Sequence, residues 1–224
     1  DKTYKMGQHG FARDNVFILF EEKNNYLCFK LKEDENTLEK YPFAFELYIS
    51  YELFENSLKI SYKVVNKDEK TMLFSIGAHP GFNWPLADER KEDSYFKFYD
   101  TFEIERLPLT KDGISSKKEK LSLYDGKLYL NEEIFKDDAL ILENLKNKTI
   151  LFANDINDKF IRVEFEEFPY IGLWSEARGT PFICIEPWHG IADFKEHNKK
   201  FDEKKAIKSL EKNEIFETNY IISI

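Results

Sequence analysis

Three short stretches of the chain place ionisable side chains beside glycine or proline, where predicted strands end. They are residues 8–13 (Gln-His-Gly-Phe-Ala-Arg), 76–85 and 184–190. Side chains at such turns are able to point into a cleft, because the backbone leaves the sheet there. These stretches are therefore the places to look for an acid and a base that act on a bound molecule.

Glu186 is the candidate general base. Strand alternation over residues 182–186 places it on one face with Phe182 and Cys184. An apolar neighbourhood raises the pKa of a carboxyl group, because burial disfavours its charged form, and this would make Glu186 a competent base near neutral pH. A carboxylate that only caps a turn at the sheet end fits the sequence equally well.

Two histidines are candidates for the acid. His79 ends an apolar strand at the point where Pro80 and Gly81 turn the chain away, and His9 precedes Gly10 in a similar setting. An imidazole with an ordinary pKa near 6.5 can donate a proton to a substrate oxygen at neutral pH. For both, a structural histidine bonded to the backbone is the alternative. The other two of the four histidines are weaker candidates.

We expect no metal and no cofactor. Metal-binding histidines usually have a close-spaced partner, as in His-x-His or His-Glu-x-x-His, and the sequence has no such pair. It also lacks a glycine-rich phosphate loop and a Gly-x-Ser-x-Gly motif. Cys28 and Cys184 lie in apolar runs, which is typical of buried thiols without a disulfide partner. The chemistry would then rest on side-chain acids and bases.

The composition favours one large β domain that binds a small molecule. Hydrophobic residues make up 42% of the 224 residues and aromatic residues 16%, which suits pleated sheets. The net charge of −9 argues against nucleic-acid binding, and no apolar run is long enough to span a membrane. We expect a single domain over residues 1–224, cytoplasmic, and a monomer or homodimer.

Alternating hydrophobicity predicts strands along most of the chain. The clearest signal is a hairpin of residues 43–53 and 58–64 around a turn at 55–57. Further strands are predicted at 16–21, 26–32, 71–77, 95–105, 139–143, 148–153, 160–166, 170–174, 182–186 and 215–223. Residues 194–210 are rich in Lys and Glu and predict a surface excursion with one short helix. Many short strands at this spacing indicate a large all-β sandwich.

Taken together, the motifs resemble the aldose 1-epimerase family, and within it the LacX-like branch. The resemblance rests on His9-Gly-Phe-Ala-Arg13, Tyr41-Pro-Phe43, Ser75-Ile-Gly-Ala-His79-Pro-Gly-Phe82, Asp138-Ala-Leu140 and Cys184-Ile-Glu186-Pro-Trp188. It implies a galactose mutarotase-like β-supersandwich with a sugar-binding cleft. The family's N-terminal strands precede the His-Gly segment and have no counterpart in this sequence, so we expect part of one sheet to be absent.

The resemblance also implies a reaction and its residues. Glu186 matches the family's catalytic base, His79 its catalytic acid, and His9 a second histidine beside the ring oxygen. Asp138 matches the carboxylate that holds a sugar hydroxyl, although Asp137 adjoins it. The implied activity is that of a mutarotase, which interconverts the α and β anomers of an aldohexose by opening and closing the ring.

Aromatic residues near these motifs are candidates for stacking on the apolar face of a sugar ring. Phe82, Trp174 and Trp188 are the predicted stacking residues, with Trp84 a further possibility, and each would serve equally as a core residue. The partner is accordingly expected to be a small-molecule sugar.

Two other functions stay open at this stage. A hexose-6-phosphate 1-epimerase would need a basic pocket, built around Arg13 and Arg178, because the planar guanidinium grips a phosphate at two points. Arg13, in the His-Gly-Phe-Ala-Arg motif, is the predicted substrate-binding arginine. A sugar-binding module without catalysis is the third possibility, and the presence of both an acid and a base argues against it.

Overall fold

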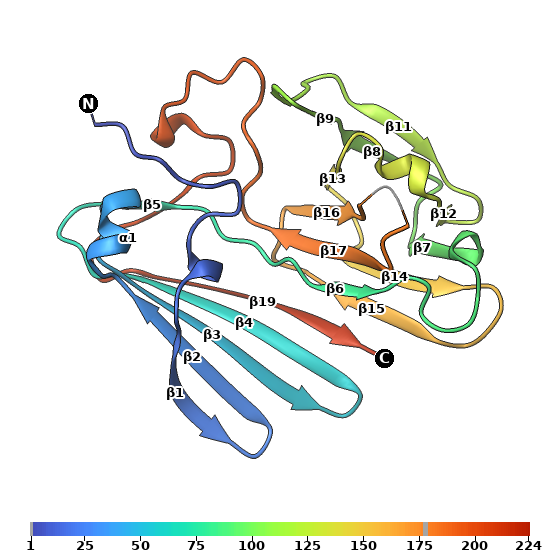
Figure 1. Ribbon diagram of the computed structural model, residues 1–224, viewed down its shortest axis with the longest axis horizontal. Helices are drawn as coiled ribbons and strands as arrows, with labels where there is room; N and C mark the ends of the chain where they lie inside the picture. Colours follow the sequence, from blue (N-terminus) through green and yellow to red (C-terminus); the bar gives the residue numbers. More distant parts are fainter. Residues whose placement is uncertain (1, 177–178) are drawn as a thin grey trace. The chain divides into compact units, whose positions relative to one another are not determined.

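The computed structural model describes residues 2–176 and 179–224. The chain divides into two compact units, one of residues 2–74 and 208–219 and the other of residues 75–207 and 220–224. Strands dominate each unit, and the only α-helix of the described residues has six residues (Figure 1). This confirms the predicted all-β class.

The first unit is built on a meander of antiparallel strands, in the order β1-β2-β3-β4-β19. Its long strands are β1 (Ile18–Lys23), β2 (Tyr26–Lys32), β3 (Phe45–Phe54), β4 (Ser57–Asn66) and the first part of β19 (Ile215–Ser223). The predicted hairpin is confirmed as β3 and β4, with a tighter turn than expected because Phe54 already pairs with Ser57. Glu55, in this two-residue turn, has φ 49°, the left-handed conformation that such a turn requires.

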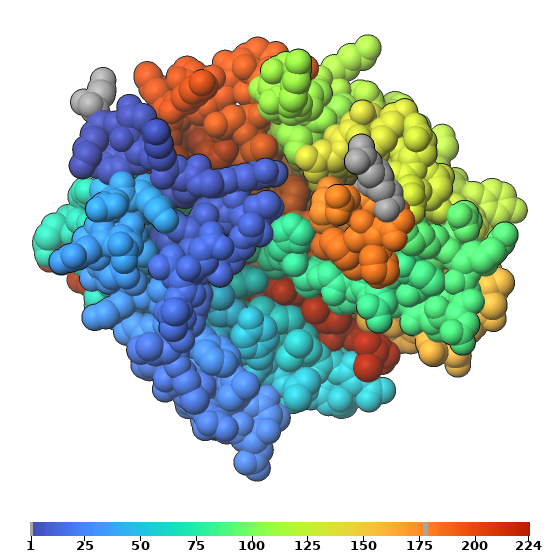
Figure 2. All heavy atoms as spheres, in the orientation of Figure 1, coloured from blue at the N-terminus to red at the C-terminus, as the bar shows by residue number. Residues whose placement is uncertain are grey.

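The β1–β2 hairpin keeps much of its apolar surface in contact with solvent. Its tip lies at the far end of the first unit from the helix, and the space-filling view shows it projecting (Figure 2). Ile18, Leu19 and Phe20 are each more than half exposed. None of the helices in the described part of the chain is long and apolar enough to cross a membrane.

The sequence gives no sign of the short helix α1 (Glu35–Lys40), because six residues are too few for a helical period to emerge. The helix begins with a capping box. The Asp34 side chain accepts a hydrogen bond from the Thr37 backbone N–H, and the Thr37 hydroxyl group accepts a hydrogen bond from the Asp34 backbone N–H. The helix predicted within residues 194–210 is wrong. That segment holds only a 3-10 turn at Phe201–Glu203 and the strand β18 (Lys208–Leu210), which pairs with β5 (Met72–Phe74).

The second unit contains the candidate site and two groups of antiparallel strands. One is a six-stranded sheet in the order β11-β8-β13-β16-β17-β6, and the other has the order β15-β14-β7-β12, with the end of β19 beside β15. The strands of the first group are β6 (Gly81–Asn83), β8 (Glu103–Leu107), β11 (Glu119–Ser122), β13 (Leu140–Glu143), β16 (Tyr170–Trp174) and β17 (Phe182–Trp188). Those of the second are β7 (Ser94–Phe98), β12 (Lys127–Tyr129), β14 (Thr149–Asn154) and β15 (Phe160–Glu164).

The remaining short elements are the two-stranded pair β9 (Leu109–Thr110) and β10 (Gly113–Ile114), with 3-10 turns at Ala12–Asp14, Lys91–Asp93 and Glu132–Phe135. Two predicted strands were too long. The predicted strand 95–105 divides into β7 and β8, because Asp100 adopts a left-handed backbone with φ 58°. The predicted strand 71–77 shortens to β5, beyond which Gly77 forms an isolated bridge with Trp188.

Apolar side chains cover one face of the six-stranded sheet. Six of them are buried in a single cluster, namely Leu107, Ile114, Ala139, Ile141, Tyr170 and Ile191. Trp174 and Trp188 pack against this cluster while remaining partly exposed. This face of the sheet is therefore apolar, with the rings of Trp174 and Trp188 at its margin. Glu186 lies on the same strand as Trp188.

Candidate active site

Glu186 lies inside the six-stranded sheet, on the central part of β17. It pairs directly with Gly172 of β16, and its residue surface is only 2% exposed. Strand alternation gives it the same face as Cys184 and Trp188, as the sequence predicted. A carboxyl group so placed does not cap an exposed turn.

Burial has a large effect on this carboxyl group. The pKa of Glu186 is raised from 4.5 to about 8, mainly by loss of hydration and in part by the nearby charge of Asp138, while the side chain of Trp188 opposes the rise. A general base needs a pKa near the working pH, so Glu186 has the proton affinity that such a role requires.

His79 is held next to Glu186 by the backbone. The preceding residue, Ala78, donates its N–H to the carbonyl oxygen of Pro187 at 2.9 Å, which ties the loop before β6 to β17. The Nδ1 atom of His79 lies 3.4 Å from Oε1 of Glu186, and 38% of the His79 side chain is exposed. The pair thus combines a buried carboxyl group with an imidazole that solvent or a ligand can reach.

Asp138 approaches the site from the start of β13. It has φ 81°, a left-handed conformation in which its carboxylate accepts a hydrogen bond from the backbone N–H of Ala139 at 2.7 Å. Its side chain is exposed, and its charge influences the pKa of Glu186. Asp137 instead lies 4.0 Å from Arg106, so the two adjacent aspartates have different surroundings.

The predicted stacking residues separate into two groups. Trp174 lies beside His79 with ring centroids 6.0 Å apart, and it pairs across the strands with Cys184. Phe82 does not share this face: it pairs with Ile183, and strand alternation turns it to the other side of the sheet. The register therefore removes Phe82 from the set around Glu186.

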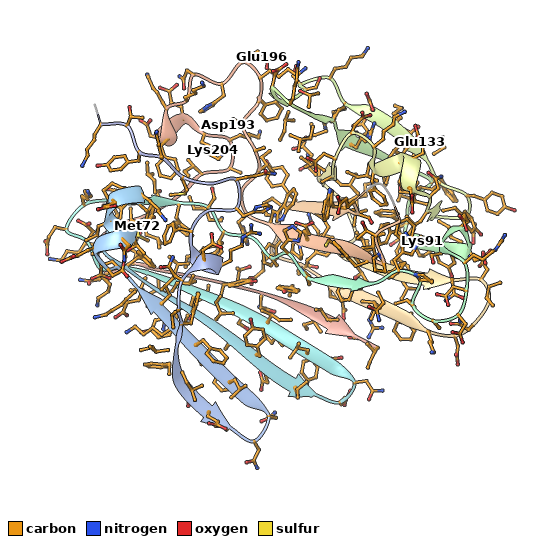
Figure 3. All side chains as sticks on the ribbon, in the orientation of Figure 1. Met72, Lys91, Glu133, Asp193, Glu196 and Lys204 are labelled. Carbon is orange, nitrogen blue, oxygen red and sulfur yellow. The ribbon has the colours of Figure 1, made fainter. Side chains whose placement is uncertain are left out.

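Trp84 is a core residue. It is fully buried and donates its indole N–H to the carbonyl oxygen of Lys91 at 3.2 Å. Lys91, labelled in Figure 3, also lies over the Trp84 ring at 4.7 Å from its centroid. Packing of this kind leaves no ring face for a sugar.

His9 and Arg13 belong to the first unit. His9 is exposed beside a turn in which Gly10 donates its backbone N–H to Gly7, and Arg13 lies in a 3-10 turn with its guanidinium 3.9 Å from Asp14. The catalytic role predicted for His9 and the substrate-binding role predicted for Arg13 stay predictions. Arg178, considered for a phosphate pocket, lies outside the described residues.

The two weaker histidines have structural surroundings. The ring of His189 is buried against Phe168, with centroids 4.4 Å apart. Nδ1 of His197 is 3.7 Å from Asp193, whose carboxylate also forms a 2.6 Å ion pair with Lys204. Asp193 and Lys204 are labelled in Figure 3. These contacts account for both side chains without a role in catalysis.

Cys184 is a site residue that the sequence analysis treated only as a buried thiol. Together with His79 and Glu186 it forms a group whose possible ligand atoms all lie within 4.8 Å of one another. Burial raises the pKa of the Cys184 thiol to about 12, and the neighbouring Glu186 adds to this rise. The expectation that no metal binds here stays a prediction.

Comparison with known families gives a match over most of the chain. The family model described as aldose 1-epimerase matches residues 1–205. Among curated proteins, the chromosomal LacX protein of Lactococcus lactis subsp. lactis is 30% identical over 227 residues, which cover 99% of this chain and 76% of that protein.

Solved structures agree with this match. The galactose mutarotase related enzyme from Lactobacillus acidophilus has a TM-score of 0.93 at 35% identity, over 99% of this chain and 75% of the other. A galactose mutarotase-like protein from Lactobacillus casei has a TM-score of 0.85 at 25% identity, over 99% and 77% of the two chains. The predicted galactose mutarotase-like sandwich fold is thereby confirmed.

Proposed function

The chain belongs to the aldose 1-epimerase family, in its LacX-like branch, and we propose that it is a mutarotase for an aldohexose. The observation that carries the proposal is the pair of Glu186 and His79, an acid and a base 3.4 Å apart on an apolar sheet face. The oxygens that must lose and gain a proton in ring opening are both bonded to the anomeric carbon. Acid and base must therefore lie close together, as these two do.

In the proposed mechanism Glu186 takes the proton of the anomeric hydroxyl group while His79 donates a proton to the ring oxygen. The bond between the anomeric carbon and the ring oxygen breaks, and an open-chain aldehyde forms. Rotation about the C1–C2 bond presents the other face of the aldehyde, and the reverse proton transfers close the ring as the other anomer. Each positioned group contributes about 10²–10⁴ to the rate.

Other residues of the site would hold the sugar. We propose that Asp138 accepts a hydrogen bond from a sugar hydroxyl group and that Trp174 packs against the apolar face of the ring. On the strength of the family motif alone, His9 is proposed as a second catalytic histidine beside the ring oxygen and Arg13 as a further sugar contact. The proposed working unit is one aldose 1-epimerase-like domain of residues 1–224, acting in the cytoplasm on a free sugar.

Anomer-exchange NMR tests the proposal directly. The measurement uses a panel of free and 6-phosphorylated aldoses at equilibrium, so that exchange is detected without net conversion. We expect faster exchange with free aldohexoses and much slower exchange after Glu186→Gln. A preference for the 6-phosphates would favour the phosphosugar epimerase, and binding of sugars without any exchange would favour the non-catalytic module.

A further inference from the structure

Trp188 occupies a space that two glycines leave open. Gly172 is the residue directly opposite Glu186, and a Cβ atom there would lie 2.5 Å from Cζ2 of the Trp188 indole. A Cβ atom on Gly77, the bridge partner of Trp188, would lie 2.6 Å from Cδ1 of the same ring. A Cβ atom at either position would collide with the indole, so the Trp188 ring fills the space that both glycines leave open.

The polar end of the ring joins the strand of the base to the segment of the acid. The Trp188 indole N–H donates to the carbonyl oxygen of Ala78 at 3.2 Å, and Ala78 immediately precedes His79. The Ala78 N–H in turn donates to the carbonyl oxygen of Pro187 at 2.9 Å, between Glu186 and Trp188. Through these two bonds, the N–H and the carbonyl group of Ala78 hold the His79 segment against β17.

We propose that Trp188 is a positioning residue, which fixes the carboxyl group of Glu186 and the imidazole of His79 relative to each other and is not a stacking platform for the sugar. This inference rests on the proposed function. The sequence predicts Trp188 as a platform, but its indole is already seated on Gly77 and Gly172 and its N–H is engaged.

The surroundings of Glu186 agree with this role. The groups that face it are the imidazole of His79, the thiol of Cys184 and the carboxylate of Asp138. Burial and the charge of Asp138 disfavour the ionised form of Glu186, whereas the polar end of the Trp188 indole favours it. Removal of the indole N–H should leave Glu186 more difficult to ionise.

Trp188→Phe is the main test, because it keeps an aromatic ring and removes the N–H. We expect kcat for anomer exchange to fall about tenfold, as loss of the hydrogen bond to the Ala78 carbonyl oxygen implies, with KM changed less than about twofold. A ¹³C-carboxyl NMR titration of the free protein should place the pKa of Glu186 above its wild-type value. Gly172→Ala is the second variant: it displaces the indole without removing it, and kcat should fall again.

Trp84→Phe is the matched control. Trp84 also donates its indole N–H to a backbone carbonyl oxygen at 3.2 Å, but it is a core residue whose ring packs against Phe135 and Lys91. This variant should lose stability while kcat and the Glu186 titration stay at wild-type values.

Two results would overturn the inference. One is a Trp188→Phe protein that titrates and turns over as the wild type does. The other is a tenfold or larger rise in KM with kcat unchanged, which is the signature of a sugar platform. The titration needs no activity, so it decides the role of Trp188 even if the wild type shows no anomer exchange. Should Trp188→Phe fail to fold, unchanged titration and turnover in Gly172→Ala would refute the proposal.

Discussion

Replacing Glu186 with Gln should stabilise the protein in alkaline solution while it abolishes the proposed base. The folded chain raises the pKa of this carboxyl group from 4.5 to about 8, mainly through burial. A raised pKa means that the folded state holds a proton which the unfolded state has already released. The wild type therefore loses stability as the pH rises from about 4.5 to about 8, and the amide of Gln, which does not titrate, avoids this loss.

The size of the effect follows from the two pKa values. Each pKa unit corresponds to about 1.4 kcal/mol in the free energy of unfolding, and part of the wild type's loss has already occurred at pH 5. The free energy of unfolding of Glu186→Gln should therefore rise by about 4 kcal/mol relative to that of the wild type between pH 5 and pH 9. For a chain of this length that corresponds to about 8–16 °C in Tm. Solvent screening reduces the figure little, because only 3% of the Glu186 side chain is exposed.

Urea denaturation of the wild type and the variant at pH 5, 7 and 9 measures this difference. Groups distant from the site titrate alike in both proteins, so the comparison reports on Glu186 and its immediate neighbours. His79→Asn is a suitable control, since it keeps Glu186 in its buried place on β17. Stability curves of wild type and Glu186→Gln that run parallel from pH 5 to pH 9 would show that the carboxyl group titrates normally, and the case for a buried base would fail.

Three further predictions concern catalysis, metal content and packing. His79→Asn should slow anomer exchange by about 10²–10⁴ with little change in KM. The double variant with Glu186→Gln should lose much less activity than the product of the two single losses, because both groups serve one ring-opening event. Fully multiplicative losses would show that the two groups act independently. Elemental analysis of the purified protein should show no stoichiometric zinc, and chelation should leave activity unchanged; zinc lost together with activity would contradict this. Gly190→Ala should destabilise the fold by about 1–3 kcal/mol, since the new Cβ atom would lie 2.5 Å from the Ser75 side chain, and Ser75→Gly should restore part of the loss in thermal unfolding.

Local patterns in the chain were sufficient for much of the fold. The alternation from Phe43 to Val64 predicted the β3–β4 hairpin, because side chains on a half-buried strand repeat every two residues. The same rule placed Glu186 and Cys184 on one face. It failed where no periodic signal exists: α1 is too short to show one, and the break between β7 and β8 depends on the backbone of Asp100.

Sequence motifs were enough to predict the fold class and to single out the ionisable groups, since the family motifs around His79 and Glu186 are contiguous in the chain. The arrangement of those groups in space depends on the tertiary structure. Burial and the 3.4 Å separation come from the pairing of β17 with β16 and β6, and the pKa of Glu186 depends on desolvation by residues distant in the chain. Register likewise turned Phe82 away and seated Trp188 over Gly172. Such contacts depend on which strands become neighbours, and no local pattern of residues encodes that.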